Sequence, residues 1–272
     1  MKRHILKFTI EAVFIFLFFS CEKVIEIDLN ISEPKIVIES EISNQPGPYT
    51  VRLTETVNFR EENAFPTLSK ATVRIYDDAG NTETLTETIT GFYNANAIQG
   101  TPGRTYTLEV TTGENTYKAV STMPPPVNID TLTVENTGSF GPAGNGETIN
   151  VQFTDPTGKN NYYRFVLIIN GIEQDGVFID NDELQDGEIK NLLLTNYSEN
   201  TKLNTGDYVT VLLQTLDKST YEYFRTLRQI SGSEGGPMEQ STSPANPISN
   251  INNGALGYFN TCAVTSKSII IP

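Results

Sequence analysis

Short segments in which apolar and polar residues alternate recur along most of the chain, and this pattern limits the fold more than any other feature. In Thr105–Thr112, the apolar side chains of Tyr106, Leu108 and Val110 alternate with polar ones, as expected of a strand with one buried face. Similar segments, bounded by Gly, Pro, Asn or Asp, are KIVIESEI, PYTVRLTE, ATVRIYD, ETLTETIT, TYKAVSTM, IDTLTVENT, TINVQFTDP, NYYRFVLIING and GDYVTVLLQTLD. Many short strands at this spacing favour β-sandwiches over alternating strands and helices, so we predict a mainly β chain.

One segment in the C-terminal part has helical spacing instead. Ser219 and Glu222 fit a capping box, in which the Ser side chain bonds the third amide and the Glu reaches back. The apolar residues that follow at helical spacing are Tyr223, Phe224, Leu227 and Ile230. Gly232 is a suitable stop, so the segment predicts a single short α-helix near 219–230.

Three consecutive prolines, Pro124–Pro126, interrupt the series of strands. Prolines cannot donate to a β-ladder and favour a stiff, extended connection. We therefore predict two β-sandwich-like modules, at 34–123 and 127–272, with the helix in the second. The segment PGRTYTLEV resembles the tyrosine corner of immunoglobulin-like and fibronectin-like sandwiches. This resemblance implies an immunoglobulin-like N-terminal module in which the Tyr106 hydroxyl bonds upstream backbone.

The first 20 residues have the features of a secretory signal peptide. Three basic residues precede the apolar run VFIFLFF, which leads into Ser20 and Cys21. This ending resembles the site cut by lipoprotein signal peptidase. We therefore predict that residues 1–20 are removed, that Cys21 carries the lipid anchor, and that 21–33 form a tether. The alternative is a plain signal peptide or a buried helix with an incidental cysteine.

Composition excludes several classes of function. The formal net charge of −14 disfavours nucleic acid as a partner, because binding it requires a basic surface. The one histidine, His4, lies in the predicted signal peptide, which excludes Ser-His-Asp and Cys-His catalysis and His-ligated metals. With Cys21 acylated, Cys262 lacks a disulfide partner, and its apolar surroundings predict a buried, unreactive thiol. We therefore expect a non-catalytic protein without a cofactor.

The segment Asp180–Glu188, DNDELQDGE, concentrates carboxylates that could bind a hard cation. Calcium sites use several oxygens from one loop, and the candidate ligands here are Asp180, Asp182, Glu183 and Asp186. The EF-hand pattern is not met, because Leu184 stands where a further ligand is required. We predict an exposed acidic hairpin without a metal and keep a weak calcium site as the alternative.

A stretch rich in Ser, Gly, Pro and Asn follows the predicted helix from Gly232 to Gly254. Its irregular backbone has polar groups that need water or another chain. The candidate residues for a partner surface are Pro237, Ser243, Pro244, Asn246 and Pro247. The alternative is an ordered strap across the edge of the sandwich, which would also protect an edge strand from aggregation.

Seven segments, taken in order, resemble one family: PYTVRL, ATVRIYDDAG, PGRTYTLEV, STMPPPVNID, FTDPTGKNNYYRF, NDELQDGE and SNINNGALGYF. The chain is similar over nearly all of its mature length to the Bacteroidota lipoproteins labelled domain of unknown function 4249. The resemblance implies an outer-membrane lipoprotein whose relatives are often encoded beside TonB-dependent receptors. It implies no catalytic residues, because the family has no established activity.

These observations together lead us to expect a lipid-anchored accessory or binding protein of the outer membrane. It would work with a TonB-dependent transporter in nutrient uptake, with the membrane as one partner and its ligand unknown. Glu22 differs from the Asp that retains lipoproteins in the inner membrane, and the face of the outer membrane stays open. The alternatives are a carboxylate-based hydrolase acting on glycans, which needs two facing carboxylates, and a surface adhesin.

Overall fold

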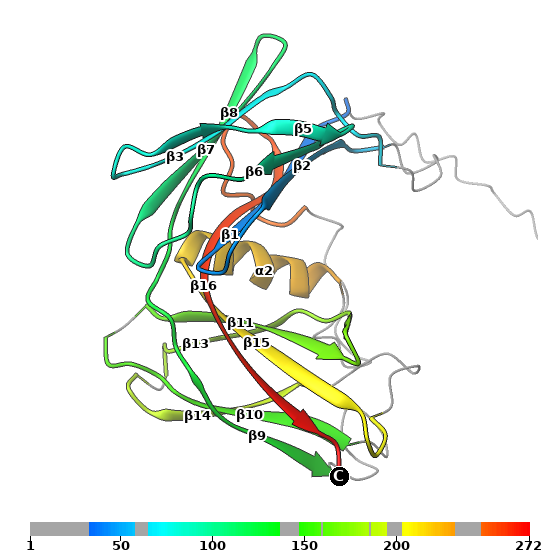
Figure 1. Ribbon diagram of the computed structural model, residues 1–272, viewed down its shortest axis with the longest axis vertical. Coiled ribbons are helices and arrows are strands. Elements are labelled where there is room, and N and C mark those ends of the chain that lie inside the picture. The colour runs from blue at the N-terminus through cyan, green and yellow to red at the C-terminus, as the bar shows by residue number, and fades with distance from the viewer. Residues whose placement is uncertain are drawn as a thin grey trace, which may run out of the picture. The chain divides into compact units, whose positions relative to one another are not determined.

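The structure is a computed structural model that describes residues 33–57, 65–136, 147–158, 160–184, 186–194, 203–231 and 246–272 (Figure 1). Pro34–Pro272 form one compact unit. The predicted signal peptide, Cys21 and nearly all of the predicted tether lie outside the described residues. Within the described part, the chain is mainly β-structure with one α-helix, so the predicted fold class is confirmed.

The first sandwich consists of two packed sheets. One sheet continues in the order β16, β1, β2, β6, β5, and the other has the order β4, β3, β7, β8. The strands are β1 (Ile36–Ser43), β2 (Tyr49–Glu55), β3 (Thr72–Asp77), β4 (Thr82–Thr84), β5 (Thr86–Ile89), β6 (Phe92–Ala95), β7 (Thr105–Thr112), β8 (Asn115–Thr122) and β16 (Leu256–Ile270). Because alternate residues of each strand point inward, the two sheets enclose a shared apolar core.

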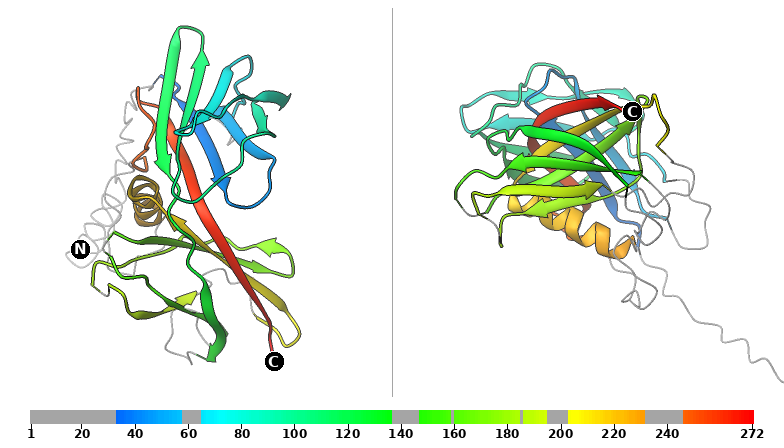
Figure 2. Two further views of the ribbon diagram at one scale, coloured as in Figure 1. Left: turned by 60° about the vertical axis from the view of Figure 1, so that its left-hand side comes forward. Right: turned by 90° about the horizontal axis from the view of Figure 1, so that it is seen from below.

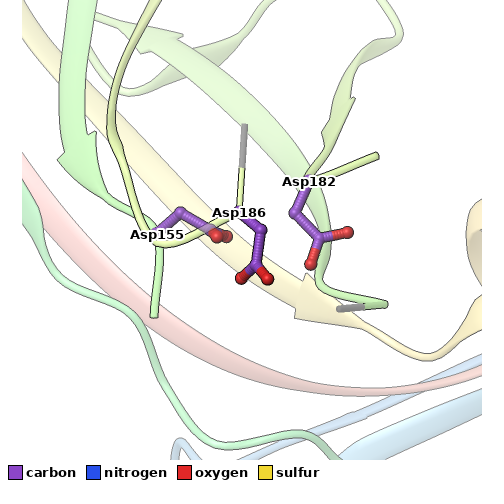
Figure 3. Close-up of side chains that lie close together, drawn as sticks. All are labelled: Asp155, Asp182 and Asp186. Carbon is purple, nitrogen blue, oxygen red and sulfur yellow. The ribbon is translucent and has the colours of Figure 1, made fainter. Parts of the chain in front are cut away.

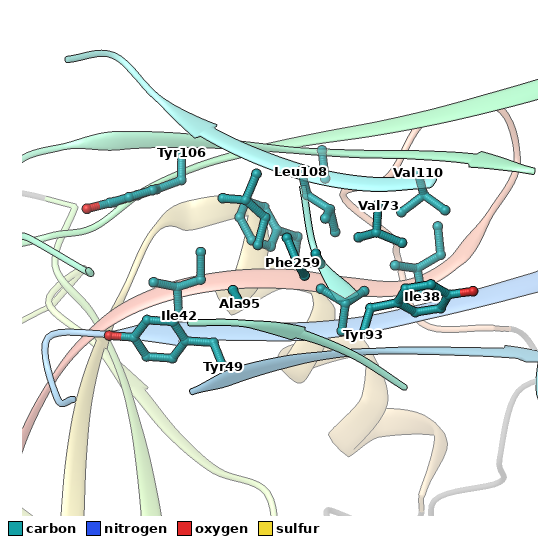
Figure 4. Packing of buried hydrophobic residues seen from close by; sticks show 14 of the residues in the cluster. Ile38, Ile42, Tyr49, Val73, Tyr93, Ala95, Tyr106, Leu108, Val110 and Phe259 are labelled. Atoms are coloured by element: carbon teal, nitrogen blue, oxygen red, sulfur yellow. The ribbon is translucent and has the colours of Figure 1, made fainter. Parts of the chain in front are cut away.

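The core of the first sandwich draws on strands that are far apart in the sequence. Figure 4 shows Ile38 and Ile42 of β1 on one side, Val73 and Leu108 of the facing sheet on the other, and Phe259 of β16 between them. All five side chains are buried. The last strand of the chain therefore contributes to the core that the first strand begins.

The tyrosine corner predicted in the first sandwich is confirmed by its hydrogen bonds. Tyr106 is fully buried. Its hydroxyl donates to the carbonyl of Gln99 at 3.0 Å and accepts from the amide of Thr101 at 2.8 Å. The residue therefore holds the loop before β7 against the core, which is a structural role.

The second sandwich packs a three-stranded layer against the other half of the long sheet. The strands are β9 (Ile129–Asn136), β10 (Glu147–Thr154), β11 (Tyr162–Ile169), β12 (Ile172–Glu173), β13 (Phe178–Asn181), β14 (Ile189–Leu194) and β15 (Tyr208–Leu216). The layer β14-β10-β9 faces the part of the long sheet made by β11, β15 and the second half of β16. Phe153 packs against both Tyr163 and Phe165 in the core between them.

Strand β16 belongs to both sandwiches. Its first half pairs parallel with β1, from Val37–Leu256 to Ser43–Cys262. Its second half pairs antiparallel with β15, from Thr215–Ala263 to Tyr208–Ile270. In Figure 2, left, the strand runs from the first sandwich to the end of the second. The two modules are therefore joined by a continuous backbone ladder as well as by Pro124–Pro126.

This pairing corrects the division expected from the sequence. The prediction assigned all of 127–272 to the second module, whereas Leu256–Cys262 complete the first. A close approach of β16 to β1 depends on Gly257, whose φ is +90°. A Cβ at this position would lie 2.1 Å from the carbonyl oxygen of Ile38, so only glycine fits there.

Helix α2 (Lys218–Ile230) covers the face of the long sheet that is opposite to β9, β10 and β14 (Figure 1). The helix begins one residue before the predicted start, and its N-cap is Asp217 rather than Ser219. The Asp217 side chain accepts from the amide of Thr220 at 2.8 Å. The predicted capping box does not form, because Ser219 lies inside the helix and its hydroxyl donates to Asp217 at 2.8 Å. Glu222 pairs instead with Arg225 at 2.7 Å.

Cys262 lies beneath this helix and is fully buried, as predicted. Burial raises the pKa of its thiol well above the ordinary value, and so suppresses the reactive thiolate.

None of the helices in the described residues is long and apolar enough to cross a membrane.

Candidate functional site

A pocket of about 470 Å³, here called the junction pocket, opens on the second sandwich beside the proline connection between the two sandwiches. Pro124–Pro126 form part of its wall, and the β10–β11 loop (residues 155–161) forms another part. Tyr162, Tyr163 and Leu216 contribute aromatic and apolar surface. The volume and the mixed lining are typical of sites for small molecules. The predicted proline linker therefore lines a candidate binding site.

Two polar side chains in the lining of the junction pocket are held by hydrogen bonds to neighbouring residues. The Asp130 carboxylate accepts from the hydroxyl of Thr154 at 2.7 Å. The side-chain amide of Asn161 donates to the carbonyls of Pro156 and Gly158, each at 2.9 Å. These bonds fix the shape of the β10–β11 loop, so the pocket wall is largely pre-formed.

A cluster of three carboxylates lies beside this loop. Ligand oxygens of Asp155, Asp182 and Asp186 all lie within 4.8 Å of one another, and Figure 3 shows the three carboxylates facing a common space. Asp155 and Asp182 are each only 1% exposed, whereas Asp186 is exposed. We call these three residues the aspartate cluster.

Each carboxylate of the aspartate cluster is oriented by a backbone amide. Asp155 accepts from Gly187 at 2.9 Å, Asp182 accepts from Asn160 at 3.1 Å, and Asp186 accepts from Gly158 at 2.8 Å. The β10–β11 loop and the β13–β14 loop (residues 182–188) therefore bond each other in both directions. Hydrogen bonds to a carboxylate fix its orientation, as they do for carboxylates that bind an ion.

Tyr163 connects the aspartate cluster to the pocket. Its hydroxyl donates to Asp155, and its ring lines the pocket. Burial, the hydrogen bond to Asp155 and the surrounding carboxylates raise the pKa of Tyr163 far above its ordinary value. The hydroxyl therefore stays protonated and remains a donor at every physiological pH.

The predicted acidic residues divide into two groups. Asp182 and Asp186 belong to the aspartate cluster. Asp180 instead pairs with Lys190 at 2.8 Å, and Glu183 is exposed outside the cluster. The sequence interpretation missed Asp155, which lies outside the acidic segment. Its signal in the sequence is the turn FTDPTGKNN directly after a strand, where Asp and Gly residues are typical of loops.

The predicted partner surface is described in part. Pro237, Ser243 and Pro244 lie outside the described residues, whereas Asn246 is exposed and Pro247 is half-buried. The chain then returns to the sandwich, beginning with a bond from the Ile248 amide to the Thr226 hydroxyl at 2.9 Å.

The segment that follows lies along β8, which is the edge strand of its sheet. Ile251 forms an antiparallel bridge with Ala119. The amide of Asn252 donates to the carbonyl of Lys118 at 3.0 Å, and the amide of Lys118 donates to the Asn252 side chain at 2.7 Å. This arrangement corresponds to the alternative reading of the loop, a strap that satisfies an edge strand.

A second hollow, of about 380 Å³, contains two carboxylates that are already used in the fold. Asp77 pairs with Arg104 at 2.8 Å. Burial would raise the pKa of Asp77, but hydrogen bonds from Asn81 and Arg104 outweigh it and hold the pKa below the ordinary value. The other carboxylate, Glu83, accepts from three successive backbone amides at Asn96–Ile98. Both groups therefore stabilise loops.

The fold and the two sites define a class of protein: two β-sandwiches joined by a shared strand, with a pocket beside their proline connection and a carboxylate cluster beside it. The chain belongs to the family described as domain of unknown function (DUF4249), which matches residues 22–268. The label expected from the seven sequence segments, domain of unknown function 4249, is therefore confirmed.

Solved structures with which the chain can be compared include two chicken proteins. A segment with two fibronectin type-III domains from tenascin is 13% identical, with 67% of this chain and 90% of that chain covered and a TM-score of 0.21. The interferon gamma receptor alpha chain is 11% identical, with 68% and 89% covered and a TM-score of 0.22. No curated protein matches the chain.

Proposed function

We propose that the protein is a lipid-anchored binding protein of the Bacteroidota outer membrane that works with a TonB-dependent transporter in nutrient uptake. The observation that carries the binding role is the junction pocket, which is pre-formed, open and lined by aromatic and polar side chains. The shared strand β16 supports this role, because its pairing with β15 fixes the sheet whose residues Thr215 and Leu216 line the pocket.

The proposed anchor would keep this pocket close to the membrane. Acyl chains on Cys21 would insert into the bilayer, since each buried CH₂ contributes about 0.8 kcal/mol and two chains suffice for stable anchoring. The residues from Cys21 to Glu33 would span at most about 45 Å if fully extended. A captured molecule would therefore be presented at a high effective concentration near the transporter.

The glycan hydrolase alternative requires two facing carboxylates about 5–10 Å apart in a cleft. Among the described residues that line the junction pocket, Asp130 is the one acidic residue. The two carboxylates of the second hollow are bonded to backbone amides or to Arg104, and the three of the aspartate cluster are each bonded to a backbone amide outside the lining of the junction pocket or at its edge. The geometry thus favours binding over hydrolysis. A surface adhesin is distinguished by location, because it requires exposure on the outer face of the cell.

The transporter partnership is tested by affinity purification of the tagged protein from outer membranes. We expect a TonB-dependent receptor to copurify with the wild-type protein. If no such receptor is recovered, the partnership is refuted. In parallel, Cys21→Ser should leave the membrane fraction, and its retention there would refute the anchor. Protease treatment of intact cells then distinguishes a periplasmic from an outward-facing protein.

The pocket is tested with a variant that fills it. Asn128 lines the pocket and is exposed, so Asn128→Trp should block entry while leaving the core intact. Glu114→Trp, in the exposed β7–β8 hairpin, is the matched control. Mass spectrometry of small molecules extracted from the purified proteins should show a species that is retained by wild type and control and absent from Asn128→Trp. Equal extracts from all three would refute the pocket's role.

A further inference from the structure

The aspartate cluster carries negative charge that no described cation balances. None of its three carboxylates forms an ion pair with a Lys or Arg among the described residues. The nearest basic side chain in sequence that the structure describes is Lys190, which pairs with Asp180 and donates to the carbonyl of Asn181. Like charges at this spacing repel strongly where water is excluded.

One oxygen of the cluster is also without a hydrogen-bond partner. Asp182 Oδ2 is buried and meets no donor among the described residues, and the Asp182 side chain lies beside Asp186 (Figure 3). Buried polar atoms are almost always satisfied, and a buried carboxylate oxygen without a partner is costly. An unpartnered anionic oxygen within a group of carboxylates is the feature that a bound cation would satisfy.

The geometry of the cluster suits calcium. Its three ligand oxygens lie within 4.8 Å of one another. Calcium binds oxygen at about 2.3–2.6 Å, so two ligands of one ion are separated by at most about 5 Å. Carboxylates are hard oxygen ligands, which exclude the soft metals that prefer sulfur. Because the three carboxylates are held by backbone amides, they would need little rearrangement to bind the ion.

We propose that Asp155, Asp182 and Asp186 form a calcium site that clamps the β10–β11 loop to the β13–β14 loop. The remaining oxygens would come from water at the exposed Asp186 side and from nearby backbone. The clamp would order one wall of the junction pocket, since the β10–β11 loop lines that pocket. This consequence for the pocket rests on the proposed binding function, whereas the ion site itself does not.

The proposal is tested on the detergent-solubilised mature protein after treatment with a chelator. Titration with Ca²⁺ should raise the melting temperature, by about 5–10 °C at 100 times the dissociation constant. We expect a dissociation constant on the order of 10⁻⁴–10⁻³ M, as in other extracellular modules. Tb³⁺ should bind in the place of Ca²⁺ and emit when tyrosine is excited, because Tyr163 contacts Asp155 and the chain contains no Trp.

Two variants and one control distinguish an ion site from a merely acidic surface. Asp182→Asn and Asp186→Asn should lose the melting shift and at least tenfold of the Tb³⁺ affinity. Glu183→Gln removes one charge from the same loop outside the cluster and should behave as wild type. In chelator, Asp182→Asn should melt no lower than wild type, since it removes an unbalanced buried charge.

Three results would overturn the proposal. The first is the absence of a melting shift in the wild type at Ca²⁺ concentrations up to about 100 mM, 100 times the upper expected dissociation constant, together with the absence of terbium emission. The second is an equal loss in Glu183→Gln, which would indicate nonspecific attraction. The third is an equal destabilisation of Asp182→Asn with and without calcium, which would indicate a purely structural carboxylate. All are measured without ligand or receptor, so they are independent of the tests of the proposed function.

Discussion

Asp217 caps helix α2 and also ties that helix to the first sandwich. One carboxylate oxygen accepts from the Thr220 amide and from the Ser219 hydroxyl, both at 2.8 Å. The other accepts from the Ser121 hydroxyl at 2.6 Å and from the Thr122 amide at 3.2 Å. A single side chain therefore joins β8 to the start of the helix, and Asp217→Ala removes both connections at once.

The two losses can be estimated separately. Replacing an N-cap by Ala costs about 1 kcal/mol. Losing charge-assisted bonds to β8 costs about 2 kcal/mol more, because Ser121 keeps its other contact with Thr261 at 2.8 Å. We therefore expect Asp217→Ala to lower the free energy of unfolding by about 3 kcal/mol. This corresponds to roughly 6–12 °C in melting temperature for a chain of this size.

Urea denaturation followed by circular dichroism measures this change. The matched control is Ser219→Ala, because the sequence pattern marks Ser219 as the cap while the structure gives that role to Asp217. Ser219→Ala should cost less than about 1 kcal/mol, the usual net value of one hydrogen bond. Asp217→Asn keeps the cap and should cost about 1 kcal/mol through weaker bonds to β8. A larger loss for Ser219→Ala than for Asp217→Ala would refute this reasoning.

Three further predictions concern single buried positions. Gly257→Ala should lower the free energy of unfolding, measured by urea denaturation, by at least about 3 kcal/mol, because the added Cβ would meet the backbone of β1. The control Gly254→Ala has a positive φ but open space around the added Cβ, and it should cost about 1 kcal/mol. In protein beginning at residue 22, Cys262 should react with a thiol reagent at neutral pH only after unfolding, since burial raises its pKa. Hydrogen bonds outweigh burial and lower the pKa of Asp77 in the folded protein. The ionised carboxylate therefore stabilises the fold above the unfolded pKa of about 3.9, and this stabilisation is lost as pH falls through the lower folded pKa. The difference in unfolding free energy between wild type and Asp77→Asn should therefore shrink as denaturation is repeated from about pH 6 down to about pH 3.

The aspartate cluster shows how far a site can be predicted from a chain like this one. Asp182 and Asp186 are close in sequence, and their segment drew attention through its density of carboxylates. Asp155 was missed because its proximity depends on strand register. Thr154 pairs with Ile189, and Tyr162 pairs with Asn181, so the two loops between these pairs lie side by side. Register between strands from different parts of the chain is a long-range property that local composition does not report.

The segment that lies along β8 shows a second limit of prediction from the sequence. The Ser, Gly, Pro and Asn content of the loop predicted irregular backbone correctly as far as the structure describes it. Composition left open whether its polar groups meet another chain or this one. The unpaired edge of β8 decided the question for Ile251 and Asn252, which bond to that edge.

The sequence by itself determined the features that depend on side-chain periodicity and on local backbone preference. Alternation specified the strands, the change of period located the helix to within one residue, and the Gly-x-x-Tyr segment specified the tyrosine corner. Only the tertiary structure decided which partner each strand takes. Strand β16 pairs with β1 up to Cys262 and with β15 from Ala263 onward. Its local sequence allows pairing with either strand, and packing across the whole unit decides which half takes which partner. That choice joins two modules into one unit.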